Sequence, residues 1–198
     1  MFLTAWGFRS LLVAAAVTAT AWQLVPAGAV TIPASDGASS VLWPLVPTLV
    51  AVAVPPVLAS ADRDLELTAA RSRVRMRGIA LAACLVVVAV AVVPGHRFDL
   101  VVAARNAAFL TGLAAAGSAL FPPVAWVPVS VTPMVMWLLG TDPLTRRLAG
   151  WAVLLEPRAC LPASAVAWGA ALAGSAAYLA RGWIISGWRP TDPRPGQR

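Results

Sequence analysis

The stretch ALFPPVAWVP, residues 119–128, lies near the middle of a charge-free segment that runs from Asn106 to Thr141. A helix needs about 20 apolar residues to cross a hydrocarbon core of about 30 Å. The segment is long enough for two such helices. Pro122 and Pro123 remove two backbone N–H donors and restrict the residue before them, so they interrupt a helix. The stretch therefore predicts a tight hairpin between two helices.

On either side of this hairpin the chain alternates between long apolar runs and short charged clusters. Other charge-free stretches cover residues 10–35, 37–61, 78–95 and 159–180. Together they predict an all-α integral membrane protein, a single transmembrane domain over residues 1–198 that ends in a flexible cytoplasmic tail, 181–198. The expected membrane-spanning helices lie near residues 10–30, 40–60, 78–95, 104–121, 124–140 and 160–180.

The composition points to the same class of protein. The chain is 60% hydrophobic and 12% charged, with a mean hydropathy of +0.79, which is outside the range of soluble domains. All fifteen basic residues are arginine, and they lie beside the apolar runs without any recognisable nucleic-acid-binding module. We therefore expect the net charge of +7 to orient the chain in the bilayer, and we expect no nucleic-acid partner.

The arginines predict the orientation. Cytoplasmic segments are richer in Arg and Lys than external ones. With the N-terminus inside, six spans place ten arginines in the cytoplasm and five outside, whereas a hairpin that does not cross twice gives nine and six. Both termini are therefore expected inside a plasma-membrane, multi-pass protein. A signal peptide cleaved near 27–29 is an alternative for the first span, which is longer than a usual signal core.

The most charged stretch is ADRDLELTAARSRVRMR, residues 61–77, with eight of the twenty-three charged side chains. Its acids precede its arginines, which is the order that complements a helix dipole, and Leu67, Ala70 and Val74 share one side. The stretch either fixes topology only or forms a cytoplasmic helix that docks a soluble partner. Because acids contribute little to orientation, we favour docking. The candidate docking residues are Asp62, Asp64, Glu66, Leu67, Arg71, Val74 and Arg75.

Two further places carry polar side chains within or beside apolar runs. Asp99 is expected to cap a helix that carries Arg105 and Asn106 about two turns in. Arg105 could snorkel to the interface, pair with a carboxylate, or line a polar path. The segment LAGWAVLLEP, residues 148–157, predicts a short interfacial or re-entrant helix that ends at Glu156. Glu156 is expected to pair with Arg158 or another arginine, and pairing with Arg105 stays open.

Small and aromatic residues predict internal packing. Gly112 and Ala116, Gly169 and Ala173, and Ala170 and Gly174 are spaced four apart, which permits close helix contact. The other packing candidates are Cys84 and Cys160, as buried thiols, and Trp22 and Trp168, which fall inside spans.

No catalytic motif is visible in the sequence. His96 is the only histidine, and neither an HExxH motif nor a GxxxxGK[ST] phosphate loop occurs. We therefore expect no enzyme activity, cofactor or metal in this chain. If the protein does energy-driven work, a separate partner protein hydrolyses ATP to supply the energy.

Roughly residues 41–180 resemble the small permease subunits of ABC-type exporters of GC-rich Gram-positive bacteria. The stretches that carry the resemblance are RDLELTAAR (63–71), ARNAAFLTGLA (104–114), WVPVSVTPMVMWLLG (126–140) and WAVLLEP (151–157). The resemblance implies six spans, a coupling helix within 62–77, a separate ATP-binding subunit, and a second membrane subunit, identical or different. The chain lacks the long N-terminal amphipathic helix and the external domain of larger relatives, which leaves substrate and direction open.

Two other functions stay open. A structural or assembly subunit of a larger membrane complex would explain why so few polar groups lie within the spans. An intramembrane enzyme would need a polar catalytic cluster that a single histidine does not supply.

Overall fold

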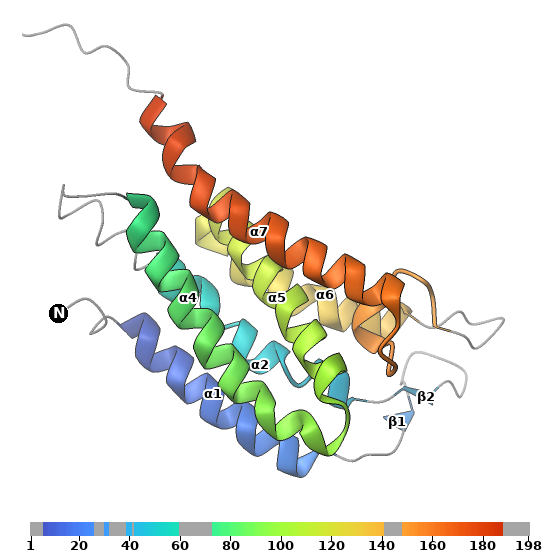
Figure 1. Ribbon diagram of the computed structural model, residues 1–198. Coiled ribbons are helices and arrows are strands. Elements are labelled where there is room, and N and C mark those ends of the chain that lie inside the picture. The colour runs from blue at the N-terminus through green and yellow to red at the C-terminus, as the bar shows by residue number, and fades with distance from the viewer. Residues whose placement is uncertain are drawn as a thin grey trace, which may run out of the picture.

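The computed structural model describes residues 6–25, 30–31, 39–40, 42–59, 73–140 and 148–187 (Figure 1). This part of the chain is mostly helical and contains one short antiparallel pair, β1 (Val30–Thr31) and β2 (Ser39–Ser40). The α-helices are α1 (Trp6–Leu24), α2 (Thr48–Ala51), α4 (Arg73–Val92), α5 (Leu100–Leu120), α6 (Trp126–Leu139) and α7 (Leu161–Gly187), and residues 54–59 are also helical. The 3-10 turns are η1 (Trp43–Leu45), η2 (Val93–Arg97), η3 (Pro122–Val124) and η4 (Val153–Leu155).

Two local predictions are confirmed. The chain turns at the two prolines, because α5 ends at Leu120, η3 follows, and α6 begins at Trp126. The turn is close: a Cβ added at Gly117 would lie 2.9 Å from the carbonyl oxygen of Ala125. Asp99 caps α5, since its Oδ1 accepts hydrogen bonds from the backbone N–H groups of residues 101 and 102 at 2.9 and 3.1 Å.

The bundle has two ends, which we name after their central side chains. At the Tyr178 end, the Tyr178 hydroxyl donates to the carbonyl of Leu58 at 3.0 Å, and the Arg77 guanidinium lies 5.7 Å from the Tyr178 ring centroid. Arg181 donates there to the carbonyl of Ser118 at 2.5 Å. These contacts bring together the starts or ends of helices that are far apart in the sequence.

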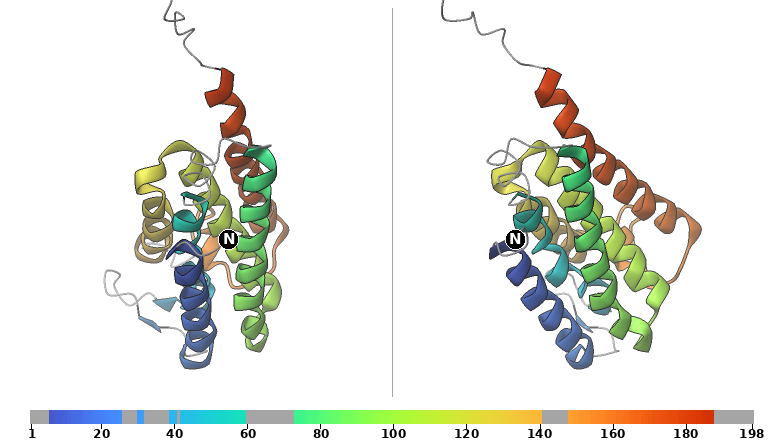
Figure 2. Two further views of the ribbon diagram at one scale, coloured as in Figure 1. Left: turned by 90° about the vertical axis from the view of Figure 1, so that its left-hand side faces the viewer. Right: turned by 60° about the vertical axis from the view of Figure 1, so that its left-hand side comes forward.

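At the opposite, Arg105 end, the Nε1 of Trp22 donates to the carbonyl of Ala91 at 3.2 Å, and Arg97 donates to the Gln23 side chain at 2.5 Å. Taken with the contacts at the Tyr178 end, these fix the direction of each helix. Consecutive helical segments, namely α1, 42–59, α4, α5, α6 and α7, run alternately from one end to the other, side by side (Figures 1 and 2).

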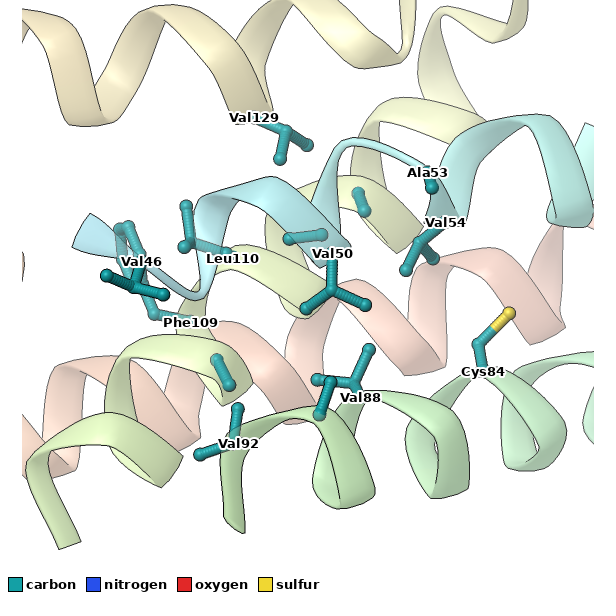
Figure 3. Packing of buried hydrophobic residues seen from close by; sticks show 14 of the residues in the cluster. Val46, Val50, Ala53, Val54, Cys84, Val88, Val92, Phe109, Leu110 and Val129 are labelled. Carbon is teal, nitrogen blue, oxygen red and sulfur yellow. The ribbon is translucent and has the colours of Figure 1, made fainter. Parts of the chain in front are cut away.

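The second helical segment is broken and buried. Prolines at 44, 47, 55 and 56 explain why residues 42–59 form η1, α2 and a further short helix instead of one continuous helix. Val46, Val50 and Val54 face Leu110 of α5 and Val88 of α4, with α6 on the other side (Figure 3). The segment therefore runs through the core of the bundle.

Helices α5 and α7 make the closest backbone contact. A Cβ added at Gly112 would lie 2.5 Å from the carbonyl oxygen of Ala170, and one added at Gly174 would overlap the carbonyl of Gly112. The predicted role of these three small residues is confirmed. Gly169 is exposed, with no atom of the described chain within 4 Å of an added Cβ, so its pair with Ala173 lies outside this interface.

Three helical stretches are long and apolar enough to cross a membrane: Val74–Arg97, Leu100–Leu120 and Leu161–Arg181. Shorter apolar helices cover Phe8–Leu24, Trp43–Ala59 and Trp126–Leu139. Many large apolar side chains point outward from the bundle, among them Val13, Val90 and Leu172. A helical bundle with such a surface has the length and surface chemistry that a lipid bilayer requires.

Several expected boundaries need correction. Helix α4 begins at Arg73, so Val74, Arg75 and Arg77 lie on the helix expected to start at residue 78. Helix α7 continues to Gly187, so residues 181–187 are helical where a flexible tail was expected. The segment 148–157 contains only the 3-10 turn η4, whose N-cap and C-cap backbones are not helical, instead of a short helix.

Candidate functional site

The most polar buried site in the described chain is formed by Arg105 and Asn106, in the second turn of α5. Both side chains are 0% exposed. The prediction that Arg105 snorkels to the interface is therefore wrong. The Asp99 cap fixes the start of α5, and this places the two side chains against η1 and η4, where the backbone is not α-helical.

Arg105 uses its guanidinium to hold the segment before α7. Its Nη1 donates to the carbonyl of Arg158 at 3.0 Å, and its Nη2 donates to the carbonyls of Val153 and Glu156 at 3.1 and 2.7 Å. Its Nε donates to the Oδ1 of Asn106 at 3.0 Å. Four of the five N–H groups of the guanidinium are thus engaged.

Asn106 extends the network to a second segment. Its Nδ2 donates to the carbonyls of Pro44 and Leu154, each at 2.8 Å, while its Oδ1 accepts from Arg105. Both amide N–H groups are therefore engaged. Two adjacent side chains on α5 thus tie η1 and η4 together at the Arg105 end.

Prolines explain why these carbonyls need side-chain donors. In a 3-10 turn a carbonyl accepts from the N–H three residues later. For Pro44 and Leu154 that residue is Pro47 or Pro157, which has no N–H. A buried carbonyl without a donor is costly, most of all in an apolar bundle. The side-chain amide of Asn106 supplies both missing donors.

Glu156 does not pair as the sequence indicated. Its carboxylate accepts from the backbone N–H of Arg158 at 3.2 Å, and the guanidinium of Arg105 meets its carbonyl instead. The hydrogen-bond partners of Arg105 among the described residues are all neutral oxygens. The charge is therefore stabilised by oriented carbonyl and amide dipoles.

An aromatic cluster packs beside Arg105 and Asn106. Trp43 stacks on Phe98 with ring centroids 5.4 Å apart, and Trp22 lies 5.8 Å from the same ring. The predicted packing of Trp22 is confirmed by its complete burial, whereas Trp168 is 52% exposed, so that prediction is wrong. Sequence reasoning missed the contact of Trp43 with Phe98, because nothing local links two residues so far apart.

The polar groups of the site make their hydrogen bonds within the chain itself. The N–H groups of Arg105 and Asn106 donate to oxygens of the same chain, and neither side chain is a nucleophile. Among the described residues, no group of three or more His, Cys, Asp or Glu side chains could hold a metal ion. Cys84 is a fully buried free thiol, as predicted, while the free thiol of Cys160 is only half buried.

Of the candidate docking residues, only two belong to the described part of the chain. Val74 is 39% exposed and Arg75 is exposed, both at the start of α4 and hence at the Tyr178 end. Sequence reasoning missed the cluster of Arg77, Tyr178 and Leu58 beside them; the single tyrosine of the chain was its only signal. The candidates outside the described residues are Asp62, Asp64, Glu66, Leu67 and Arg71.

Comparisons of the chain with protein-family models, with curated proteins and with solved structures find no match.

Proposed function

We propose that this chain is the membrane subunit of an ABC-type transporter, with six spans and both termini in the cytoplasm. In this proposal it docks a separate ATP-binding subunit through residues 61–77. The observation that carries the proposal is the alternation of six apolar helical segments between two ends of unequal charge. The described arginines at the Tyr178 end are Arg9, Arg73, Arg75, Arg77 and Arg181, and those at the other end are Arg97, Arg105 and Arg158.

The charge difference orients the bundle. One arginine at each end is enclosed within the bundle, Arg77 at the Tyr178 end and Arg105 at the other, so the difference in charge between the ends remains. By the positive-inside rule we assign the Tyr178 end to the cytoplasm. Ala59 and Arg73, the described residues on either side of 60–72, then lie toward the cytoplasmic side.

The two short segments fit six spans for a physical reason. Helix α6 has 14 residues and is about 21 Å long at 1.5 Å per residue, less than a hydrocarbon core. The preceding turn, η3, adds to its reach at the Tyr178 end. Residues 42–59 lack a continuous helix, but broken backbone is tolerated at membrane depth when it is buried in protein.

Co-purification tests the docking proposal. The full chain is expressed with the ATP-binding protein encoded by a neighbouring gene, and Arg71, Arg73 and Arg75 are changed together to Glu. We expect the unaltered chain to form a complex and the reversed variant to lose it, with unchanged membrane levels. The matched control is Arg97→Glu, an exposed arginine at the other end, which should keep the complex. A complex that survives the reversal contradicts docking at 61–77.

A second function is favoured by one observation. The Arg105 and Asn106 donors are engaged within the chain, which suits a structural subunit without its own transport path. Crosslinking separates the two proposals. A photoreactive group attached at Val74→Cys should capture the ATP-binding subunit if the chain is a permease. Capture of another multi-span protein alone would favour the structural subunit.

A further inference from the structure

We propose that Arg105 and Asn106 form a latch that holds residues 148–158, here called the cap segment, over one end of the bundle. The cap segment is released as a unit when the latch opens. The inference goes beyond the permease proposal and does not rest on it, since it concerns contacts within this chain.

The cap segment has little structure of its own. Its backbone hydrogen bonds run from Ala149 to Gly140 at 2.8 Å, from Ala152 to Ala149 at 2.9 Å and from Leu155 to Ala152 at 3.0 Å. Four further carbonyls of the segment, those of residues 153, 154, 156 and 158, accept from the two latch side chains. Among the described residues, the latch therefore supplies four of the five hydrogen bonds that join the segment to the rest of the bundle.

The cap segment also closes the end of the bundle sterically. Val153, Leu154 and Leu155 are buried, and they lie against the end of α6. The fit there is tight: a Cβ added at Gly140 would lie 2.8 Å from the Cβ of Ala152 and 3.0 Å from the Cδ1 of Leu155. Release of the segment would withdraw these apolar side chains and expose the interior between α5, α6 and α7.

The arrangement makes release all-or-none. All donors come from two neighbouring residues on one helix turn, so a shift of α5 relative to the cap segment breaks their hydrogen bonds together. A partly open state would leave a buried charge and several carbonyls without partners, which is costly. Packed interfaces of this kind switch between discrete states and do not deform continuously.

The two cysteines of the chain can report on this motion, one beside the cap segment and one in the core. Cys160 is half buried and follows the cap segment by two residues, whereas Cys84 is fully buried in the core between α4 and residues 42–59 (Figure 3). A thiol reagent should therefore reach Cys160 when the latch opens and should reach Cys84 only when the whole bundle unfolds.

The experiment measures labelling of both cysteines by a maleimide in the purified full-length protein in lipid bilayers, with each site resolved by peptide mass spectrometry. We expect Arg105→Gln to raise the labelling rate of Cys160 about tenfold or more, because the four hydrogen bonds of the guanidinium, two of them buried, are lost or weakened. The rate at Cys84 should not change. Arg97→Gln, which alters an exposed arginine at the same end, should leave both rates unchanged.

Two more variants separate geometry from charge. Arg105→Lys keeps the charge but lacks the planar fork, so it should also accelerate Cys160 labelling. Asn106→Leu should also accelerate Cys160 labelling. The double variant Arg105→Gln, Asn106→Leu should accelerate labelling by less than the product of the two single accelerations. An unchanged Cys160 rate in Arg105→Gln, a Lys variant that behaves like the unaltered chain, or equal acceleration at Cys84 would each overturn the latch.

Hydrogen exchange tests the latch without any substitution, should the variants fail to fold. In the unaltered protein, the backbone N–H groups of Ala149, Ala152 and Leu155 should exchange at one common rate, faster than those in the middle of α5. Unequal rates for the three, or rates as slow as those of α5, would contradict release as a unit.

Discussion

Arg105 illustrates how a charge can be kept inside an apolar bundle without a carboxylate as a hydrogen-bond partner. Its guanidinium donates to three backbone carbonyls and to Asn106, so each hydrogen bond supplies partial negative charge. The sequence indicated a polar residue two turns into a helix but gave no sign of its partners. Those carbonyls belong to residues 48 to 53 positions away, and no side-chain pattern marks a carbonyl that needs a donor.

Replacing Arg105 with Met tests its structural role. Met fills much of the space but donates no hydrogen bond, so one buried carbonyl, two part-buried carbonyls and the Asn106 oxygen lose this donor. We expect the free energy of unfolding to fall by about 3 kcal/mol or more. Arg97→Met should change it by less than about 0.5 kcal/mol, because Arg97 is exposed. Denaturant titration in mixed micelles measures the free energy of unfolding of both variants. Equal losses in the two variants would contradict the structural role of Arg105.

Tyr178 allows a finer test at the opposite end. Tyr178→Phe removes the hydroxyl that donates to Leu58 and keeps the ring that Arg77 covers. We expect a loss of about 1 to 2 kcal/mol in stability, mainly from the buried carbonyl left without a donor. Tyr178→Leu should cost more, because the contact with the guanidinium also disappears. The same titration applies, and a Phe variant as unstable as the Leu variant would argue against the ring contact.

Among the helices, local signals predicted the breaks well. Two adjacent prolines marked the hairpin between α5 and α6, and Asp99 marked the start of α5, because both act through the backbone of their immediate neighbours. The four prolines of residues 42–59 could have predicted the broken helix by the same reasoning. The segment 148–157 was misjudged as a helix, since its apolar residues face the bundle interior and its backbone is held by α5.

The contact of α5 with α7 provides a matched pair of glycines. Gly112→Ala should destabilise the bundle by about 1 to 3 kcal/mol, because the new methyl group meets the backbone of Ala170 and the helices must move apart. Gly169→Ala should be neutral or stabilising, because its Cβ meets open space and Ala favours helix. Unfolding in micelles compares them, and a harmless Gly112→Ala would mean that the two helices can separate at little cost.

As a whole, the molecule is a bundle whose helices alternate in direction, and composition alone predicted its class. Three helices have spanning length by themselves, and the alternating direction of the six helical segments is seen only when contacts at the two ends are traced. Those contacts, such as Trp22 with Ala91 and Tyr178 with Leu58, join residues 69 and 120 positions apart. Hydropathy reports which residues prefer lipid, and it carries no information about such pairs.

Cysteine accessibility in intact cells tests the orientation. In a background in which Cys160 is changed to Ser, Gly150→Cys at the Arg105 end should react with an impermeant maleimide added outside. Arg75→Cys at the Tyr178 end should react only after the membrane is permeabilised. External labelling of Arg75→Cys would reverse the orientation proposed here.

The broken segment of residues 42–59 has a consequence for how the protein is made. Synthesis proceeds from the amino terminus, so this segment leaves the ribosome before α4, α5 and α6, which later enclose it. Its interrupted backbone is poorly suited to lipid on its own. With six spans as proposed, we expect the segment to need shelter at the insertion machinery until those helices arrive, and chains stopped before α5 to be cleared by membrane proteases. The order in which the helices emerge is thus part of what lets this bundle assemble.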